Sequence, residues 1–324
     1  MKKDLELERL KTLTLLLRYN HNHDSKGRFS SGGGGGGGGR VYGKTDTTDA
    51  LAEINSGKSN SLEKHMDKNG KLTAEREQLH KDIIDKELEG KTPVEGQATM
   101  TMLGGGPASG KSSVMSTKDV DSSTVVVDPD GMKQKLPGYA EMSKQSSNAA
   151  SYYHEESSAL AKRYSETAYS ENYNVIYDGT GDGSVKSVEK KINKAKEQGY
   201  RVEAKYVTVD TEEAVRRNQK RYDDAKAKGE NPRLPPEDMV RSCHAKVTDI
   251  SVATAPQFDH IEVWDNNGGK GKQVKIAEGG SGKYLKAVKG QEKAFQNYLA
   301  KGTKGLAGFT TLSDGQVMPV SDKK

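Results

Sequence analysis

The sequence predicts an α/β fold built around a parallel sheet. An apolar stretch at residues 98–103 leads into a glycine-rich loop at 105–112, and a β-branched stretch follows at 123–127. From there to residue 267, stretches of strand and helix character alternate. This alternation is typical of parallel sheets, whose strands are joined by crossover helices. Polar residues that directly follow the strands are therefore the candidates for a functional site.

The elements of this core follow from short apolar or β-branched runs and from longer stretches with helical periodicity. Strands are expected at 98–103, 123–127, 173–177, 201–209 and 260–264. Helices are expected at 152–170, 185–198, 211–228 and 236–253, and a further short helix leaves the glycine-rich loop near Gly110. These elements define a core domain at residues 98–268.

Three segments flank the core. Residues 1–40 combine a leucine-containing helical stretch with eight consecutive glycines and read as a helical, glycine-rich tether. Residues 41–97 are polar and helical, with Thr73 as a helix N-cap and a narrow apolar stripe that includes Leu79 and Ile84. Residues 269–324 form a C-terminal extension with one helix at 291–299 and a turn-rich tail, in which we find no catalytic motif.

Composition limits the partners and the compartment. The chain has 51 Lys and Arg against 46 Asp and Glu, and this mild excess is spread without a basic block, so a nucleic-acid partner is not expected. One cysteine, Cys243, excludes an intramolecular disulfide and offers too few ligands for zinc even with His244. The leucine-rich N-terminus fits neither a signal peptide nor a membrane span, so we expect a cytoplasmic protein without a membrane partner.

The glycine-rich loop matches the pattern G-x-x-x-x-G-K-[ST], which predicts a phosphate-binding loop. Glycines let successive backbone N–H groups turn toward a nucleotide phosphate, while Lys111 reaches the β- and γ-phosphate oxygens and Ser112 ligates Mg²⁺. The residues expected to bind the nucleotide are Gly105, Gly106, Pro107, Ala108, Ser109, Gly110, Lys111, Ser112 and Ser113.

Acidic residues end the second and third predicted strands. Asp128 and Asp130 follow residues 123–127, where a carboxylate can orient and deprotonate an attacking hydroxyl group. The alternative is that Asp128 caps a turn through residues 129–131. Asp178 and Thr180 follow the third strand, where they can hold a metal-bound water or the acceptor, although a simple type I turn explains them equally well.

Charged residues on two helices complete the candidate site. Glu155 and Glu156 open the helix at 152–170, where they can act in the site or complement the helix dipole. Arg217 and Arg221 share a face of the helix at 211–228, and Arg233 follows it. Such arginines can neutralise charge on a transferring phosphoryl group, while a solvated helix face is the alternative.

In their order along the chain these motifs resemble the zeta toxins, P-loop kinases that use ATP to phosphorylate the 3′-hydroxyl of UDP-N-acetylglucosamine. The resemblance covers about residues 101–264 and rests on G-x-P-x-S-G-K-S, V-V-D-x-D, H-E-E-S-S, N-V-I-x-D-G-T, the arginine helix and R-x-P-P. It implies a P-loop kinase sheet with strand order 2-3-1-4-5. It also implies ATP and Mg²⁺ as cofactors, a small-molecule acceptor and a separate small helical antitoxin.

The resemblance also implies roles for individual residues. It places the catalytic base at Asp130 and the phosphate-binding lysine at Lys111. The remaining implied residues are the substrate-holding Glu156, Asp178 and Thr180 and the phosphate-clamping Arg221 and Arg233.

Three positions depart from the family's pattern. Ala108 replaces a common glycine, a change expected to be tolerated where no positive φ is needed. Asp178 is one methylene shorter than the usual glutamate, and the adjacent Glu155 and Glu156 both fit the acid's position.

A nucleoside or polynucleotide kinase is the alternative enzyme class. A phage-associated interaction protein is the alternative outside enzymes, because residues 22–34 resemble a linker of phage head-associated proteins, which suggests a phage origin and a head-protein partner for residues 1–40.

Overall fold

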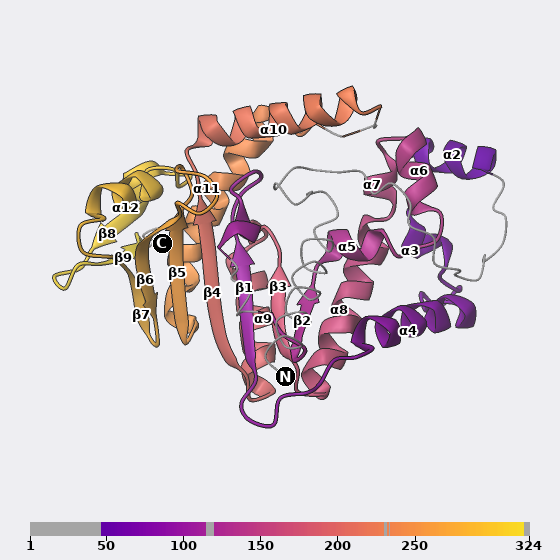
Figure 1. The fold of residues 1–324 in the computed structure, drawn as a ribbon, viewed down its shortest axis with the longest axis horizontal. Coiled ribbons are helices and arrows are strands. Elements are labelled where there is room, and N and C mark those ends of the chain that lie inside the picture. The colour runs from indigo at the N-terminus through magenta and orange to yellow at the C-terminus, as the bar shows by residue number, and fades with distance from the viewer. Residues whose placement is uncertain (1–46, 115–119, 230–231, 233, 321–324) are drawn as a thin grey trace, which may run out of the picture. The chain divides into compact units, whose positions relative to one another are not determined.

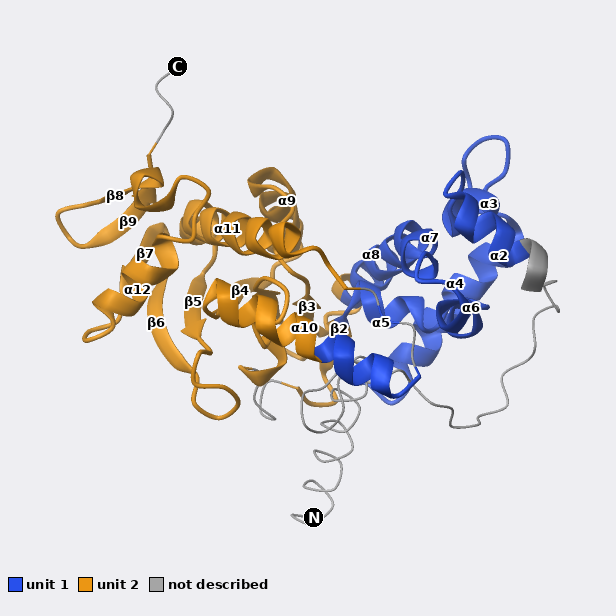
Figure 2. Ribbon diagram, turned by 90° about the horizontal axis from the view of Figure 1, so that it is seen from above, with its two compact units in different colours: residues 1–92, 127–168, 221–233 blue, residues 93–126, 169–220, 234–324 orange. Residues whose placement is uncertain are grey.

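The computed structural model describes residues 47–114, 120–229, 232 and 234–320 (Figure 1). The chain divides into two compact units, which Figure 2 distinguishes by colour. The first unit consists of residues 1–92, 127–168 and 221–233, and the second consists of residues 93–126, 169–220 and 234–324.

A single sheet organises the second unit. In the described part of the chain it has nine strands in the order β2-β3-β1-β4-β5-β6-β7-β9-β8. Its first five strands reproduce the expected order 2-3-1-4-5, and β3, β1, β4 and β5 pair in parallel. The strands are β1 (Thr99–Gly104), β2 (Thr124–Val127), β3 (Asn174–Asp178), β4 (Arg201–Thr208), β5 (His260–Asp265), β6 (Val274–Gly280), β7 (Lys283–Ala287), β8 (Phe309–Thr311) and β9 (Gln316–Pro319).

Helices lie on the sheet and make up most of the first unit. Within the second unit α9 packs against β4 and lies beside α11 (Figure 2). The α-helices are α2 (Thr47–Ser56), α3 (Ser61–Lys64), α4 (Ala74–Leu88), α5 (Pro129–Lys133), α6 (Tyr139–Gln145), α7 (Ala149–Tyr152), α8 (His154–Ser170), α9 (Val185–Glu197), α10 (Thr211–Ala227), α11 (Glu237–Thr254) and α12 (Glu292–Leu299). The 3-10 turns are η1 (Lys111–Ser113), η2 (Ala255–Gln257) and η3 (Gly305–Gly308). None of the helices in these ranges is long and apolar enough to cross a bilayer.

The register of the parallel strands brings their carboxyl ends to one edge. Leu103 of β1 is paired with Asp178 of β3, and Thr208 of β4 is paired with Asp265 of β5. The strand interiors are apolar, with Met100, Val202 and Ile261 fully buried. Burial of these runs fixes the sheet, and the polar residues after the strands are left together at its carboxyl edge.

The C-terminal extension continues the same sheet, with strands that the sequence analysis did not predict. The four strands β6 to β9 pair antiparallel beyond β5, while the expected helix is present as α12. Just after α12, the amine of Lys301 donates hydrogen bonds to Thr208 Oγ1 at 2.7 Å and to the Val209 carbonyl. Burial lowers the pKa of Lys301 to about 8, although Asp265 and Asp210 oppose that shift. The extension therefore reaches back to the carboxyl end of β4.

Three short helices, α5, α6 and α7, lie between residues 129 and 152 in the first unit, where the sequence predicted no helix and a turn at 129–131 was only an alternative. Asp128 is the N-cap of α5, its carboxylate accepts the Asp130 N–H at 2.9 Å, and Pro129 occupies the first helical position. Proline at this position has the φ that a helix needs and lacks an N–H that would be unpaired in any case. The capping role that was the alternative for Asp128 is thus present.

Helix α4 begins where expected but buries a different face. Thr73 is its N-cap and accepts a hydrogen bond from the Arg76 N–H. The buried residues are Arg76, His80 and Ile84, spaced four apart, whereas Leu79 is only half-buried. A helix whose buried face is mostly polar must find polar partners there.

Candidate active site

The glycine-rich loop after β1 is shaped by two glycines with positive φ. Gly105 has a φ of 151° and Gly110 a φ of 84°. A Cβ on Gly105 would lie 2.6 Å from the Val207 carbonyl oxygen, and a Cβ on Gly110 would lie 2.2 Å from Asn266 Nδ2. The Gly105 N–H donates to the Thr180 carbonyl at 2.9 Å, which ties the loop to the segment after β3. Both positions require glycine for conformation and for space.

Ala108 also adopts the left-handed conformation, with a φ of 61°. The condition under which its replacement of glycine was expected to be tolerated is therefore not met. A non-glycine residue in this region costs roughly 1–2 kcal/mol. The Ala108 methyl group is buried beside Val209, Ala214 and Val240, and this packing offsets part of the strain.

The residues after Gly110 form a described turn of 3-10 helix, η1, at the place of the expected short helix, and residues 115–119 lie outside the described residues. Lys111 extends back across the loop, where its amine donates to the Gly105 carbonyl at 3.3 Å. The Ser113 hydroxyl donates to the Gly110 carbonyl at 2.5 Å, while Ser112 is exposed. The lysine amine is thus at the loop and the Ser112 side chain is accessible.

One observation indicates that this loop fits a phosphate group. The Ser109 hydroxyl is buried, with 1% of the residue exposed, and has no hydrogen-bond partner within the described structure. A buried hydroxyl without a partner is costly, and a phosphate oxygen is a suitable acceptor for it. Together with the amine of Lys111, the loop residues fit the phosphates of a nucleotide.

The segment after β3 holds Thr180 in a small polar cluster. The Thr180 hydroxyl donates to Asp182, and the Cys243 thiol donates to the other Asp182 oxygen at 3.3 Å. Burial raises the pKa of Cys243 to about 12, and Asp182 adds to that shift. Burial alone would raise the pKa of Asp182, but the hydrogen bonds from Thr180 and Cys243 lower it below its usual value. Asp182 is therefore an ionised acceptor beside Thr180.

Asp130 lies in the first turn of α5, in the first unit. Its carboxylate is 71% exposed and accepts a hydrogen bond from Lys133 Nζ at 2.6 Å. The rest of Lys133 is buried, so its amine is held at this position. An exposed, oriented carboxylate is the arrangement that a general base needs before its substrate binds.

Glu156 is fully buried in the first unit and each of its oxygens is engaged. Arg76 donates from Nε to Oε1 at 2.5 Å and from Nη2 to Oε2 at 2.9 Å. His80 Nε2 lies 2.9 Å from Oε1, and the Ser61 hydroxyl donates to Oε2. Burial would raise the pKa of Glu156, but the hydrogen bonds from His80 and Arg76 lower it to about 2. The carboxylate therefore joins α3 and α4 to α8 as an anion.

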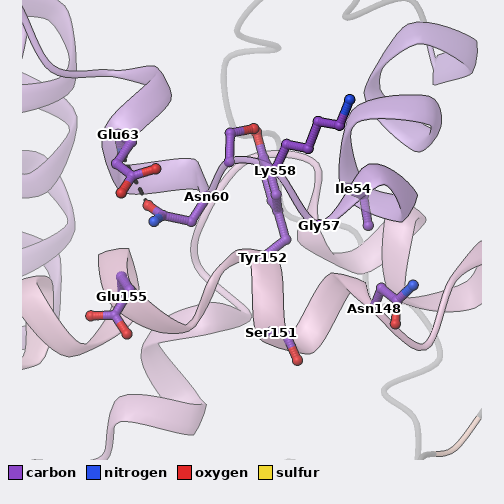
Figure 3. A pocket seen from close by; sticks show the side chains of 10 residues that line it. Ile54, Gly57, Lys58, Asn60, Glu63, Asn148, Ser151, Tyr152 and Glu155 are labelled. Atoms are coloured by element: carbon purple, nitrogen blue, oxygen red, sulfur yellow. Dashed lines mark hydrogen bonds between the residues drawn. The ribbon is translucent and has the colours of Figure 1, made fainter.

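The neighbouring Glu155 has a contrasting environment. It is exposed and lines a cavity of about 480 Å³ together with residues of the α2–α3 connection and of α7. Figure 3 shows Glu155 on the same side of this cavity as Glu63 and Asn60. Of the two glutamates, Glu155 is thus accessible to a ligand and Glu156 is enclosed.

The expected arginines are only partly described. Arg221 lies on α10, is half-buried and is engaged in interactions of its own, whereas Arg233 lies outside the described residues. Arg217, four residues earlier, donates to Glu213 and also to the carbonyls of Ala108 and Asn266, at 3.4 and 3.1 Å.

The structure brings some of the predicted residues together in the second unit. In the second unit the loop residues Gly105 and Lys111 lie beside Thr180, at the edge where Asp178 ends β3. The first unit holds Asp130, Glu156 and Arg221. The residues that sequence reasoning missed are Arg76, His80, Asp182 and Asn266.

A second acidic cluster lies on β5 and β6. Ligand atoms of His260, Glu262 and Glu278 are within 4.8 Å of one another. Lys275 Nζ is 2.7 Å from Glu278 and 3.3 Å from Glu262, so a lysine already supplies positive charge to these carboxylates. The cluster is therefore a surface ion-pair network.

The sheet order and the phosphate-fitting loop define a P-loop kinase fold. The family model described as zeta toxin matches residues 84–271, more than half of the chain. The protein belongs to the zeta toxin family and is, by class, an ATP-dependent kinase. No curated protein matches the chain.

Solved structures share the fold at low sequence identity. A structure from the PezAT chromosomal toxin–antitoxin system of Streptococcus pneumoniae is 18% identical, with a TM-score of 0.51 over 63% of this chain and 82% of that chain. The native AvrRxo1-ORF1:ORF2 complex is 20% identical, with a TM-score of 0.52 over 83% of this chain and 82% of that one. The same complex with sulphate ions gives a TM-score of 0.50 at 20% identity, over 74% and 78%.

Proposed function

We propose that the protein transfers the γ-phosphate of ATP to a hydroxyl group of a small molecule, with UDP-N-acetylglucosamine as the first candidate acceptor. The observation that carries this proposal is the phosphate-binding loop after β1. Its positive-φ backbone, the buried Ser109 hydroxyl and the Lys111 amine together fit a nucleotide phosphate. Membership in the zeta toxin family supports both the reaction and the acceptor.

Charge stabilisation is assigned to the loop, to α10 and to Arg233. Lys111 neutralises the β- and γ-phosphate oxygens, and Arg221 and Arg233 neutralise charge that develops on the transferring group. Ser112 is exposed at the end of the loop and is the residue that would hold Mg²⁺, which supplies further positive charge to the phosphates.

Asp130 is assigned as the base. It accepts the proton of the acceptor hydroxyl as that oxygen attacks the γ-phosphorus, and the bond to the leaving ADP oxygen breaks. The hydrogen bond from Lys133 limits the rotamers of the carboxylate and leaves most of it exposed. A base held in this way contributes on the order of 10²–10⁴ in rate.

Asp178 and Thr180 are proposed to hold the acceptor. The hydroxyl of Thr180 is oriented by Asp182, so its lone pairs can accept a hydrogen bond from a sugar hydroxyl. Glu156 is a weaker candidate than the sequence implied, because Arg76, His80 and Ser61 already engage its oxygens. Glu155 is the accessible acid of the pair.

The test is transfer of ³²P from γ-labelled ATP to a panel of UDP-N-acetylglucosamine, nucleosides and DNA ends. Asp130→Asn is compared with Asp128→Asn, a matched aspartate that caps α5 two residues away. The proposal expects label on the sugar nucleotide, a loss of orders of magnitude in Asp130→Asn and in Lys111→Ala, and much smaller loss in Asp128→Asn. Label on nucleosides or DNA ends instead would show that they, and not UDP-N-acetylglucosamine, are the acceptor. Equal loss of activity in both aspartate variants would contradict the assignment of Asp130 as the base.

Partners and location are also proposed. A small helical antitoxin is expected because the family includes toxins that are paired with one, and a solved structure of similar fold belongs to a toxin–antitoxin system. A phage head protein bound through residues 1–40 and a cytoplasmic or virion location remain sequence-based proposals, since those residues lie outside the described part. Pull-down with the full chain and with a chain lacking residues 1–40 separates the two partners.

A further inference from the structure

Three consecutive carbonyl groups of the phosphate-binding loop are held by side chains from other elements. His244 of α11 donates from Nε2 to the Pro107 carbonyl at 2.9 Å. The His244 ring is buried and is packed so closely that a Cβ on Gly106 would lie 2.4 Å from it. Because a carbonyl can only accept, the proton of this imidazole is on Nε2.

The next two carbonyls have their own donors. Arg217 Nη1 of α10 donates to the Ala108 carbonyl at 3.4 Å, and Asn266 Nδ2, just after β5, donates to the Ser109 carbonyl at 2.8 Å. Asn266 is itself buried, and its Oδ1 accepts from Gln273 at 3.2 Å. The side-chain amide therefore has a fixed orientation, with its nitrogen toward the loop.

The geometry of the peptide bond gives these contacts a consequence for anion binding. In a trans peptide the C=O and the following N–H point in opposite directions. Holding the Pro107 and Ser109 carbonyls against His244 and Asn266 turns the N–H groups of Ala108 and Gly110 to the other side of the loop. The Ser109 N–H stays in a turn, where it donates to the Gly106 carbonyl at 3.1 Å.

The strained backbone of Ala108 requires hydrogen bonds from outside the loop. Ala108 has a φ of 61° and lies between Pro107 and Ser109, whose carbonyls accept the two shortest of these hydrogen bonds. A loop that contains a left-handed alanine relaxes unless neighbouring groups fix it. Donors on α10, α11 and the end of β5 supply that constraint from three directions.

We propose that His244, Asn266 and Arg217 are positioning residues that keep the phosphate-binding loop in its anion-receiving conformation before nucleotide binds. This inference rests on the proposed function, since it takes the loop's ligand to be a polyphosphate. None of the three side chains needs to touch the ligand, and their effect is on the affinity of the loop for phosphates.

The experiment compares variants of the full chain for binding of MgATP and of tripolyphosphate, which carries the phosphates without a nucleoside. His244→Leu removes a donor at nearly constant volume, Asn266→Asp removes a donor and adds a negative charge beside the loop, and His244→Gln keeps an NH₂ donor at the position of Nε2. Arg217→Lys is matched with Arg216→Lys, because Arg216 pairs with the same Glu213 and is 73% exposed. Thermal unfolding of each variant identifies any that is not folded.

The expected result is a weakening of about fivefold to tenfold for both ligands in His244→Leu, as for the loss of one hydrogen bond, and a larger weakening in Asn266→Asp, whose carboxylate also repels the phosphates. His244→Gln is expected to bind like the original protein, and Arg217→Lys to bind more weakly than Arg216→Lys. Unchanged binding of tripolyphosphate in the folded His244→Leu and Asn266→Asp variants overturns the inference. A weakening confined to ATP overturns it as well, because it would indicate that these side chains contact the adenine or the ribose of ATP and not its phosphates.

Amide hydrogen exchange without nucleotide separates this inference from the proposed function. Faster exchange at residues 106–110 is expected in His244→Leu and Asn266→Asp, with His244→Gln unchanged. If the original protein binds neither ligand but the variants exchange faster, the proposed function fails and the positioning role stands. Equal exchange in all variants rejects the positioning role whatever the binding result.

Discussion

Arg76 and Glu156 form a buried ion pair that joins two parts of the chain with different relations to the family. Arg76 Nη2 lies 2.9 Å from Glu156 Oε2, with 9% and 0% of the two side chains exposed. Glu156 lies within the residues that match the zeta toxin model, whereas Arg76, His80 and Ser61 precede them. The polar segment before the family core is thus anchored through a carboxylate of that core.

Removing Arg76 is expected to destabilise the protein strongly. In Arg76→Leu the Glu156 carboxylate stays buried with one cationic partner fewer, which typically costs about 3–5 kcal/mol. The matched control is Arg163→Leu, since Arg163 pairs with Glu77 between the same two helices at 33% and 53% exposure. That exposed pair contributes about 1 kcal/mol or less. Urea unfolding of both variants measures the difference, and equal losses would contradict the buried pair's importance.

His244 is expected to make stability depend on pH in a mildly acidic window. Burial lowers the pKa of His244 to about 4 from 6.5, with Lys111 and Lys301 adding to the shift and the Pro107 carbonyl and Asp210 opposing it. Between these values the unfolded chain binds a proton that the folded protein does not. The free energy of unfolding therefore falls as pH is lowered from 6.5 to 4, by up to about 3 kcal/mol.

The measurement is urea unfolding of the original protein and of His244→Gln at pH 7, 6 and 5. His244→Gln has no titrating group at this position, so its stability is expected to fall less steeply over the same range. The contribution of the other titrating groups cancels in the difference between the two proteins. Parallel pH profiles would show that His244 does not titrate as its burial requires.

Much of the core was predictable because its signals are local. The five parallel strands and the helices α9, α10 and α11 begin and end within a few residues of their expected positions. Short apolar runs alternate there with longer periodic stretches, and each strand or helix is determined by its own local sequence. The glycine-rich loop was readable for the same reason, since its conformation is set by Gly105 and Gly110 themselves.

The features that were missed depend on distant partners or on weak patterns. Arg76 and His80 lie four apart and look like a solvated helix face, because nothing nearby reveals that Glu156, 80 residues away from Arg76, is their partner. Strands β6 and β7 contain Gly or Lys residues, and β8 and β9 are only three and four residues long, so the hydrophobic pattern of these strands is faint. Helix α5 had a usable signal, the Asp128 cap followed by Pro129, but the sequence analysis predicted no helix there and gave a turn only as an alternative.

Ala108 is expected to tolerate glycine but not a β-branched residue. Ala108→Gly relieves the left-handed strain of roughly 1–2 kcal/mol, but it also removes a buried methyl group and makes the unfolded chain more flexible, each costing up to about 1 kcal/mol. These effects nearly cancel, so we expect a change within about 1 kcal/mol. Ala108→Val adds volume against Val209 and Val240 at a φ of 61° and should destabilise by about 2 kcal/mol or more, because overpacking typically costs about 1–3 kcal/mol and the β-branched side chain adds strain at this φ. Thermal unfolding compares them, and a large loss in Ala108→Gly would mean that methyl packing outweighs the strain.

Asp182 is expected to affect acceptor use through Thr180. Its carboxylate accepts from the Thr180 hydroxyl, which leaves the lone pairs of that oxygen directed at a ligand. Asp182→Asn replaces an ionised acceptor with a neutral amide, and a charge-assisted hydrogen bond is worth about 1 kcal/mol more than a neutral one. If Thr180 binds the acceptor, the KM for the acceptor rises about fivefold to tenfold, while the affinity for ATP stays unchanged.

Cys243→Ser provides the matched control, since serine keeps a donor to Asp182 at nearly the same place. It should retain both the KM for the acceptor and the affinity for ATP. Steady-state kinetics with the acceptor found in the ³²P assay, together with ATP titration, measure both quantities. A rise in the KM for ATP in Asp182→Asn would instead indicate that Asp182 acts on the phosphate-binding loop, to which the Thr180 carbonyl is joined through the Gly105 N–H. A loss of kcat without any change in KM would indicate that Thr180 interacts with the acceptor only in the transition state, because such an interaction does not contribute to acceptor binding.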